Sequence, residues 1–291
     1  MLVNIHYLCY AIIEARACMK VLIYYNKEKD VNGACKTKLI DALNNSDIDY
    51  QILQDDMLSY SMTADALFVI GGDGTILYIV EFALRNNIPI IGINVGKLGF
   101  LCEFEKSCIE DAVLEFKNAK LVEDKRSVLS IKYKGKNYYA LNELYIQKFY
   151  DPSVGNGLAG LQIEIDDEIV SKFSGDGVMV CTPTGSTAYS FSYGAPILVP
   201  HADVFTMIPI ASHSFNQRPV IYSSDSNCKI TSLKDVKIGV FIDGELVDYI
   251  NKNSVLQIDG FDKKLLFLRN KNYSFFRKLS NKLYKALGEE I

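Results

Sequence analysis

A glycine-rich string between an apolar run and a helical pattern constrains this chain more than any other feature. Residues 66–70 are all apolar and end abruptly at Gly71-Gly72-Asp73-Gly74-Thr75, after which 76–84 carry apolar side chains at helical spacing. The same order recurs nearby, with strands expected over 21–25 and 88–93 and a helix over 36–43. Strands separated by helices form parallel sheets with right-handed crossovers. The sequence therefore predicts half of a doubly wound, Rossmann-like α/β domain.

The rhythm changes after about residue 126, where short strands with turn residues between them replace the alternation. Turn signals occur at Gly135, over the acidic 166–168 and at Asp243-Gly244. Strands are expected over 130–133, 138–146, 161–165, 169–173, 178–181, 204–210, 220–223, 237–242 and 265–268. This pattern is typical of an antiparallel β domain.

The C-terminal segment 274–287 predicts an amphipathic helix that packs back on the first domain. Its expected apolar stripe consists of Phe276, Leu279, Leu283 and Leu287. Eight bases and no acid occupy 263–285, and we interpret them as a solvated polar face rather than a polyanion site. The expected organisation is an extension over 1–18, an α/β domain over 19–126 with 270–291 returning to it, and a β domain over 127–269.

Composition narrows the functional classes. The 31 bases and 35 acids leave a net charge of −4, which argues against nucleic-acid binding. The seven cysteines form no C-x-x-C pair and their number is odd, so we expect a reducing cytoplasm rather than a disulfide framework or a zinc site. Glu14 and Arg16 interrupt the apolar start of the chain, and neither a membrane span nor a secretory signal is expected.

The glycine-rich string is the first candidate site. Loops that follow parallel strands are where open α/β sheets bind ligands. Glycines let backbone N–H groups approach a phosphate at a helix N-terminus. Asp73 would repel a phosphate unless a cation bridges them or the carboxylate contacts a hydroxyl. A simple D-G turn is the alternative, but the strand, the string and the helix together favour a functional loop.

A second candidate, Thr182-Pro183-Thr184-Gly185-Ser186-Thr187-Ala188-Tyr189-Ser190, follows an expected strand. Its hydroxyls and amides suit ribose, phosphate or adenine edges. No lysine precedes Ser186, so this is not a Walker A loop, and G-x-S-x-G is absent. Hydroxyl capping of a buried helix would account for two or three of the side chains.

Asn142-Glu143 is a polar pair inside an expected strand, where neighbours face opposite sides. We therefore do not expect both to be plain surface positions, and a surface strand is the alternative interpretation. Asp176 is explained equally well by a turn. Residues 155–160 match G-x-G-x-x-G without a strand before and a helix after, so we expect only a loop there. The histidines show no metal spacing.

The motif set resembles that of the NAD kinases from about residue 19 to the end. It comprises the string 71–75, Gly92-Ile93-Asn94 with Gly96 and 98–101, the pair Asn142-Glu143, and 182–190. The glycine-rich string alone also resembles diacylglycerol and sphingosine kinases, and the last two motifs separate the groups. A departure is Gly194-Ala195-Pro196, where Gly-Gly-Pro is usual.

The resemblance implies a C-terminal β-sandwich and transfer of the ATP γ-phosphoryl group to the 2′-hydroxyl of the adenosine ribose of NAD, giving NADP. Asp73 matches the catalytic aspartate. The nucleotide-binding positions that it implies are Gly71, Gly72, Gly74, Thr75, Phe100, Asn142, Glu143, Asp176, Thr187, Ala188, Tyr189 and Ser192.

The resemblance also implies a cytoplasmic homo-oligomer, commonly a tetramer, that uses Mg²⁺ brought by ATP and binds no membrane. Since phosphoryl transfer relies on positioning and charge neutralisation, a weakly basic aspartate and few metal-binding carboxylates suffice. Two alternatives stay open: a lipid kinase that shares the glycine-rich string, and a dinucleotide-binding sensor without catalysis.

Overall fold

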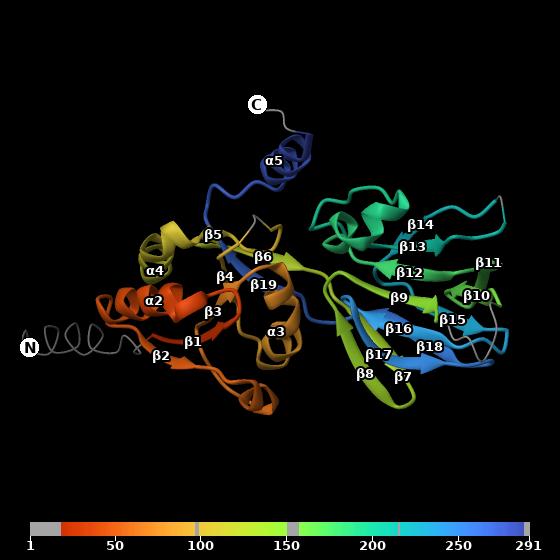
Figure 1. Cartoon of the computed structure of the whole chain (residues 1–291), viewed down its shortest axis with the longest axis horizontal. Helices are drawn as coiled ribbons and strands as arrows, with labels where there is room; N and C mark the ends of the chain where they lie inside the picture. The colour runs from red at the N-terminus through yellow and green to blue at the C-terminus, as the bar shows by residue number, and fades with distance from the viewer. Residues whose placement is uncertain (1–18, 97–98, 150–156, 215, 288–291) are drawn as a thin grey trace, which may run out of the picture. The chain divides into compact units, whose positions relative to one another are not determined.

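The structure, a computed structural model, describes residues 19–96, 99–149, 157–214 and 216–287. These residues divide into two compact units (Figure 1). The first unit runs to Asp124 and resumes at Leu266, and the second spans Lys125–Leu265. The predicted extension over 1–18 and part of the loop at 155–160 lie outside the described residues. No helix in the described ranges is long and apolar enough to cross a membrane.

The first unit is built on a seven-stranded sheet. Across the sheet the strands are β2 (Asp49–Ile52), β1 (Lys20–Tyr25), β3 (Ala66–Gly71), β4 (Ile90–Asn94), β19 (Leu265–Arg269) and β6 (Val122–Arg126), and β5 (Phe104–Glu105) pairs with β4. The predicted strands β1, β3 and β4 pair in parallel, as expected, and the β1–β2, β4–β19 and β4–β5 pairs are parallel as well. Every residue of β3 and β4 is buried, which explains their unbroken apolar runs.

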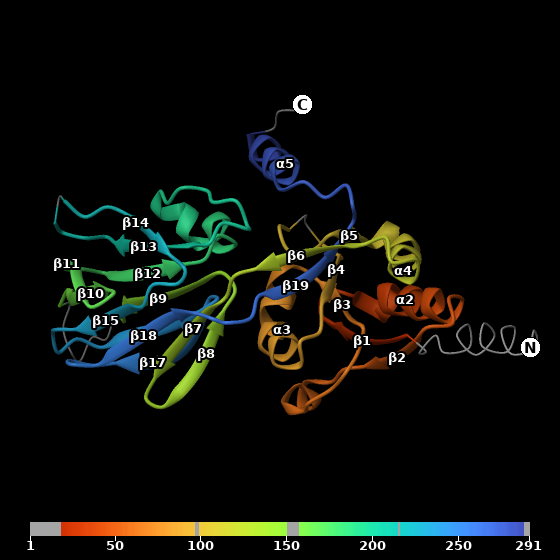
Figure 2. The same cartoon turned by 180° about the vertical axis from the view of Figure 1, so that it is seen from behind.

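Helices cover both faces of this sheet, so the unit is doubly wound (Figures 1 and 2). The helices α2 (Ala34–Asn44) and α4 (Ile109–Lys117) share a core with Val21, Phe68 and Ile91 of the strands. The helix α3 (Asp73–Asn86) lies on the other face, where its Ile76 side chain fills the space above Gly92. Short 3₁₀ turns are η1 (Val31–Gly33), η2 (Asp55–Ser59) and η3 (Lys106–Cys108).

One predicted strand belongs to the other domain. The run 265–268 forms β19, but this strand pairs in parallel with β4 of the first unit, with Phe267 opposite Ile90. The antiparallel assignment was therefore wrong. A buried strand has the same hydrophobic pattern in a parallel and in an antiparallel sheet. The pattern depends on which side chains are buried and not on which strand lies beside it.

The second unit contains two six-stranded antiparallel sheets. The first holds, in order, β11 (Glu168–Gly175), β10 (Ala159–Ile165), β15 (Cys228–Ser232), β18 (Val255–Gly260), β7 (Leu129–Tyr133) and β8 (Lys136–Ala140). The second holds β14 (Val220–Ser223), β13 (Val204–Ile210), β12 (Gly177–Cys181), β9 (Glu143–Lys148), β16 (Ile238–Ile242) and β17 (Glu245–Ile250). Buried side chains from both sheets form one core, which makes the unit a β-sandwich.

The single strand predicted over 138–146 is two strands in different sheets. β8 ends at Ala140 and β9 begins at Glu143, so the chain changes sheet at Leu141 and Asn142. The backbone N–H groups of both residues donate to the side chain of Asp243 instead of to a neighbouring strand. A distant carboxylate thus ends the strand, which no local pattern could indicate.

The C-terminal helix α5 (Phe275–Leu287) packs on the first unit, as predicted, but of the predicted stripe only Leu279 is half-buried among the described side chains. Phe276 and Leu283 are 65% and 39% exposed, and the side chain of Leu287 lies outside the described residues. The inward face instead carries Phe275, which contacts Phe100, and Lys278, which donates to the carbonyl of Cys102. The contacts of Phe275 and Lys278 with residues 100–102 therefore help to hold the helix on the first unit.

Candidate active site

The glycine-rich string forms the turn from β3 into α3. β3 ends at Gly71, Gly72 is the extended N-cap residue, and Asp73 is the first residue of the helix. The Thr75 hydroxyl accepts weak hydrogen bonds from Gly72 N at 3.4 Å and from the Asn26 amide at 3.5 Å. The first N–H groups of a helix lack intrahelical partners and carry its positive dipole end. Gly74 has open space beside it, so this turn can receive a phosphate.

The Asp73 carboxylate is held by three consecutive backbone N–H groups. Oδ2 accepts from Phe100 N at 2.6 Å, and Oδ1 accepts from Leu101 N at 3.0 Å and from Cys102 N at 3.4 Å. Gly99 lets the backbone approach this closely, because a Cβ atom there would lie 1.9 Å from Asp73 Oδ1. A carboxylate has about four acceptor positions. With three donors among the described residues, one acceptor position is left that could take a further hydrogen bond.

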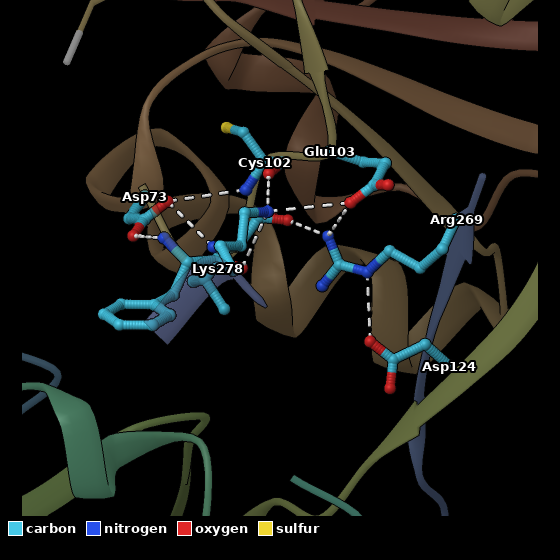
Figure 3. A network of polar contacts seen from close by, with 8 residues as sticks. Asp73, Cys102, Glu103, Asp124, Arg269 and Lys278 are labelled. Carbon is cyan, nitrogen blue, oxygen red and sulfur yellow. Dashed lines mark hydrogen bonds and ion pairs between the residues drawn. The ribbon is translucent and has the colours of Figure 1, made fainter. Parts of the chain in front are cut away.

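Two cations hold the carbonyl side of the same segment, residues 100–102 (Figure 3). Lys278 donates to the carbonyls of Phe100 and Cys102, and Arg269 donates to that of Leu101. Arg269 also donates to Asp124 at 3.0 Å and is fully buried. The basic run was interpreted as a solvated face, and that interpretation is wrong for Arg269 and Lys278. Their partners are backbone carbonyls and distant acids, which leave no mark in the local sequence.

Lys29 also lies at the glycine-rich string and was missed in the sequence. A Cβ atom on Gly72 would lie 3.2 Å from Lys29 Nζ. The lysine sits in the turn after β1, where the Asn26 side chain accepts the N–H groups of Glu28 and Lys29. β1 and β3 are parallel neighbours, so their carboxyl-end loops meet. This juxtaposition of strand ends was the signal that could have identified Lys29.

In the second unit, Asn142 and Glu143 are buried and share one acceptor, Asp243. The Asp243 carboxylate accepts hydrogen bonds from Leu141 N at 2.9 Å, Asn142 N at 2.8 Å and Glu143 N at 3.0 Å. Asp243 was predicted only as a turn residue between two strands. The turn is present between β16 and β17, with a positive φ of 48° at Asp243. Its side chain additionally fixes the backbone of the polar pair.

Burial disfavours the charged form of both carboxyl groups. It raises the pKa of Glu143 to about 8, with a further increase from the Asp243 charge. It raises the pKa of Asp243 to about 6, against the opposing effect of the three N–H donors. Glu143 Oε2 accepts no hydrogen bond within the described part of the chain. Glu143 therefore presents a protonated carboxyl at neutral pH that can donate to a ligand.

Glu143→Gln is expected to remove a pH dependence of stability. In the wild type the folded chain holds the Glu143 proton up to about pH 8, whereas an unfolded glutamate releases it near pH 4.5. The folded state thus binds the extra proton, and stability falls as pH rises between these values. Asp243 contributes in the same direction only up to about pH 6. Urea unfolding from pH 6 to 8 should show a decline in the wild type that is shallower in the variant; equal slopes would contradict the assignment.

The segment 182–190 makes more hydrogen bonds within the chain than the sequence indicated. All five of its serine and threonine hydroxyls have partners inside the chain, although capping was expected to explain two or three. The bonds join Thr182 to Leu141 O, Arg126 to Thr184, Ser186 to Pro183 O, Thr187 to Thr184 O and Ser190 to Gly185 O. The segment forms two 3₁₀ turns, η4 (Gly185–Thr187) and η5 (Tyr189–Tyr193), and no α-helix.

This segment packs directly against the polar pair. Thr182 N donates to Asn142 O at 2.9 Å. Gly185 permits the contact, because a Cβ atom there would lie 2.1 Å from Asn142 O. The structure therefore brings together two motifs about 40 residues apart and builds one surface from them.

The aromatic side of this surface is formed by tyrosines. Tyr189 lies 5.0 Å from Tyr145 between ring centroids, and its hydroxyl is 3.0 Å from that of Tyr193. Tyr145 stacks on Phe241 at 4.6 Å. Ala188, the N-cap residue of η5, and Thr187 are half-buried beside Tyr189, and Ser192 is exposed. These rings form an apolar surface next to the buried carboxyl group of Glu143.

Asp176 is not in a tight hairpin. It is the residue between β11 and β12, where the chain passes from one sheet of the sandwich to the other. Its carboxylate pairs with Lys148 at 2.7 Å. Burial and the neighbouring Tyr189 raise the pKa of the Tyr193 hydroxyl to about 12, and the Asp176 carboxylate adds to this increase. The predicted position Asp176 thus borders the tyrosine cluster.

Comparison with known proteins gives one family. The chain matches the models of the ATP-NAD kinase N-terminal domain over residues 9–119 and of the ATP-NAD kinase C-terminal domain over 141–269. An NAD kinase of Caldicellulosiruptor saccharolyticus is 32% identical over 265 residues, covering 91% of this chain and 99% of that protein. An NAD kinase of Clostridium tetani is 33% identical over 273 residues, covering 90% and 98%.

Solved structures share the fold. Yeast NADH kinase in complex with NADH superposes with a TM-score of 0.81 at 21% identity, covering 95% of this chain and 90% of that chain. An NAD kinase from Archaeoglobus fulgidus in complex with ATP superposes with a TM-score of 0.74 at 24% identity, covering 91% and 98%. The two-unit architecture is therefore the same as that of these kinases.

Proposed function

The chain belongs to the NAD kinase family, and we propose that this enzyme transfers the γ-phosphoryl group of ATP to the 2′-hydroxyl of the adenosine ribose of NAD, giving NADP. The observation that best supports this proposal is the position of the Asp73 carboxylate at the start of α3. Three backbone N–H groups fix it and leave one acceptor position free. That position suits a hydroxyl that loses its proton as the phosphoryl group arrives.

Asp73 orients the 2′-hydroxyl and accepts its proton late in the transfer, because a loose transition state needs little base strength. The turn 71–75 and the N–H groups of α3 receive the ATP phosphates. Asn142, Glu143 and the apolar surface of the tyrosine rings receive the adenosine part of NAD, together with the neighbouring Asp176, Thr187, Ala188 and Ser192. Phe100 contributes its N–H group to the orientation of Asp73.

Mg²⁺ enters with ATP in this proposal and is held mainly by phosphate oxygens. Among residues 19–96, 99–149, 157–214 and 216–287, no three His, Cys, Asp or Glu side chains form a group that could hold a metal ion. Asp73 is the one acidic residue of the turn 71–75. When bound, the cation would neutralise part of the phosphate charge, and the N–H groups of the turn and Lys29 would neutralise another part.

The direct test is a coupled assay for NADP formation from NAD, ATP and Mg²⁺ by the purified chain. Formation of NADP supports the proposal. Binding of NAD in calorimetry without NADP formation would favour the dinucleotide sensor. Failure to bind NAD would favour the lipid kinase alternative. An assay with diacylglycerol and sphingosine as phosphoryl acceptors would then test it. We also propose a cytoplasmic homo-oligomer, a tetramer. Sedimentation tests its oligomeric state, and cell fractionation tests its location.

Lys29→Ala is expected to raise the KM for ATP about 3–10-fold, through loss of roughly 1 kcal/mol of attraction to the phosphates. The KM for NAD should change less, because Lys29 lies at Gly72 of the turn proposed to receive the ATP phosphates, whereas the residues proposed to bind adenosine belong to the second unit. Lys27→Ala is the matched control, since Lys27 is an exposed lysine of the same turn. Equal KM values for ATP in the two variants would contradict the role of Lys29.

A further inference from the structure

Lys278 is a buried cation that the proposed function does not use. Its side chain is only 10% exposed. Burying an ammonium group is unfavourable unless it is paired and hydrogen-bonded. Its Nζ lies 3.6 Å from Glu103 Oε2 and donates to the carbonyls of Phe100 and Cys102. Two of these contacts are with segment 100–102, which holds Asp73, and the third is with the next residue, Glu103.

Each of two peptide groups in segment 100–102 links one cation, Lys278 or Arg269, to Asp73 (Figure 3). The Phe100 carbonyl accepts from Lys278 at 3.4 Å, and the N–H of that same peptide group, on Leu101, donates to Asp73 Oδ1 at 3.0 Å. The Leu101 carbonyl accepts from Arg269, and the N–H of its peptide group, on Cys102, lies 3.4 Å from the same oxygen. Hydrogen bonds linked through one peptide group strengthen one another. The positive charges therefore act on Asp73 through the backbone.

We propose that Lys278 is a positioning residue that fixes the reactive orientation of the Asp73 carboxylate, an inference that rests on the proposed role of Asp73. Without Lys278, segment 100–102 loses the donor to two of its carbonyls. The carboxylate can then rotate, and its free acceptor position no longer points in one direction. Arg269 is a poorer probe, because it also pairs with Asp124 and its side chain is fully buried.

The charge of Lys278 is itself sensitive to pH. Burial and the nearby Arg269 lower its pKa to about 8, whereas Glu103, Asp73 and Cys102 act in the opposite direction. The ring of Tyr273 also faces it, at 5.4 Å. Lys278 is therefore charged below about pH 8 and neutral above it. If Lys278 positions Asp73 through its charge, kcat should fall as pH rises through this value.

The first experiment compares kcat and KM for the wild type, Lys278→Met and Lys278→Arg from pH 6 to 10. Lys278→Met should lower kcat about 10²-fold at pH 7 with KM values nearly unchanged, because a small misplacement of a reacting group has that effect. Lys278→Arg should keep most of the activity and lose the fall near pH 8, because a guanidinium stays charged. Arg277→Met is the matched control, an exposed base on the same helix.

A double-mutant cycle separates positioning from direct phosphate binding and from misfolding. In an Asp73→Asn background, Lys278→Met should have little further effect on the residual single-turnover rate. An equal loss in both backgrounds, a wild-type kcat in Lys278→Met, or the same alkaline fall in Lys278→Arg would overturn the inference. Absence of NADP formation by the wild type, or full activity of Asp73→Asn, would instead overturn the proposed function.

Discussion

Asp73→Asn is expected to lower kcat by about 10²–10⁴-fold, the usual effect of losing a general base. Asparagine has nearly the same shape, and its single amide oxygen can still accept either the hydrogen bond of Phe100 or those of Leu101 and Cys102. It cannot accept the proton of the ribose hydroxyl. The KM for NAD should change only a few-fold, because the residues proposed to bind adenosine lie elsewhere in the chain.

Asp111→Asn is the matched control for this variant. Asp111 is an exposed aspartate in the first turn of α4, so its loss removes a comparable favourable interaction with the helix dipole. Steady-state kinetics should show wild-type kcat for Asp111→Asn, and circular dichroism should show both variants folded. A folded Asp73→Asn with near wild-type kcat would exclude Asp73 as the catalytic group.

Asp243→Ala is expected to lower the free energy of unfolding by about 3–5 kcal/mol, because it leaves three buried N–H donors without their charged acceptor. These donors belong to Leu141, Asn142 and Glu143, where the chain crosses between the two sheets of the sandwich. The KM for NAD should also rise, since the backbone of the proposed adenosine-binding pair is no longer held.

Asp243→Asn is a graded comparison. Oδ1 accepts from Asn142 and Glu143, and Oδ2 accepts from Leu141 alone. An asparagine with its oxygen in the Oδ1 position keeps two of the three bonds, so its stability loss should be clearly smaller than that of Asp243→Ala. Urea unfolding of the variants at pH 7 measures the difference. A wild-type midpoint for Asp243→Ala would show that Asp243 does not hold the strand break.

Much of the fold follows from local patterns. The apolar runs at β3 and β4 predicted buried parallel strands, because each strand is covered on both faces and needs apolar residues throughout. The predicted strand over 204–210 has the same bounds as β13, and the one over 220–223 the same bounds as β14. β15, β17 and β18 were not predicted: β15 and β18 alternate between more and less buried residues, and β17 has only one buried residue, so none forms a continuous apolar run.

The candidate site divides in the same way. Gly71–Thr75, Asn142-Glu143 and 182–190 are contiguous strings, so residue order alone marked them. The groups that fix them are far away in the chain: Asp243 lies about 100 residues from Asn142, and Lys278 about 178 from Phe100. Neither partner belongs to a motif, and both act through backbone atoms that any residue would supply.

The sequence by itself therefore determined the alternation of strands and helices, the chemistry of the motifs and the family. These depend on side-chain types at short spacing, where period and turn preference act directly. Only the tertiary structure decided which sheet receives β19, why the strand breaks at Leu141, and which way the Asp73 carboxylate points. Each of these is set by hydrogen bonds between backbone groups and residues distant in sequence, and such pairings become defined only when the chain has folded.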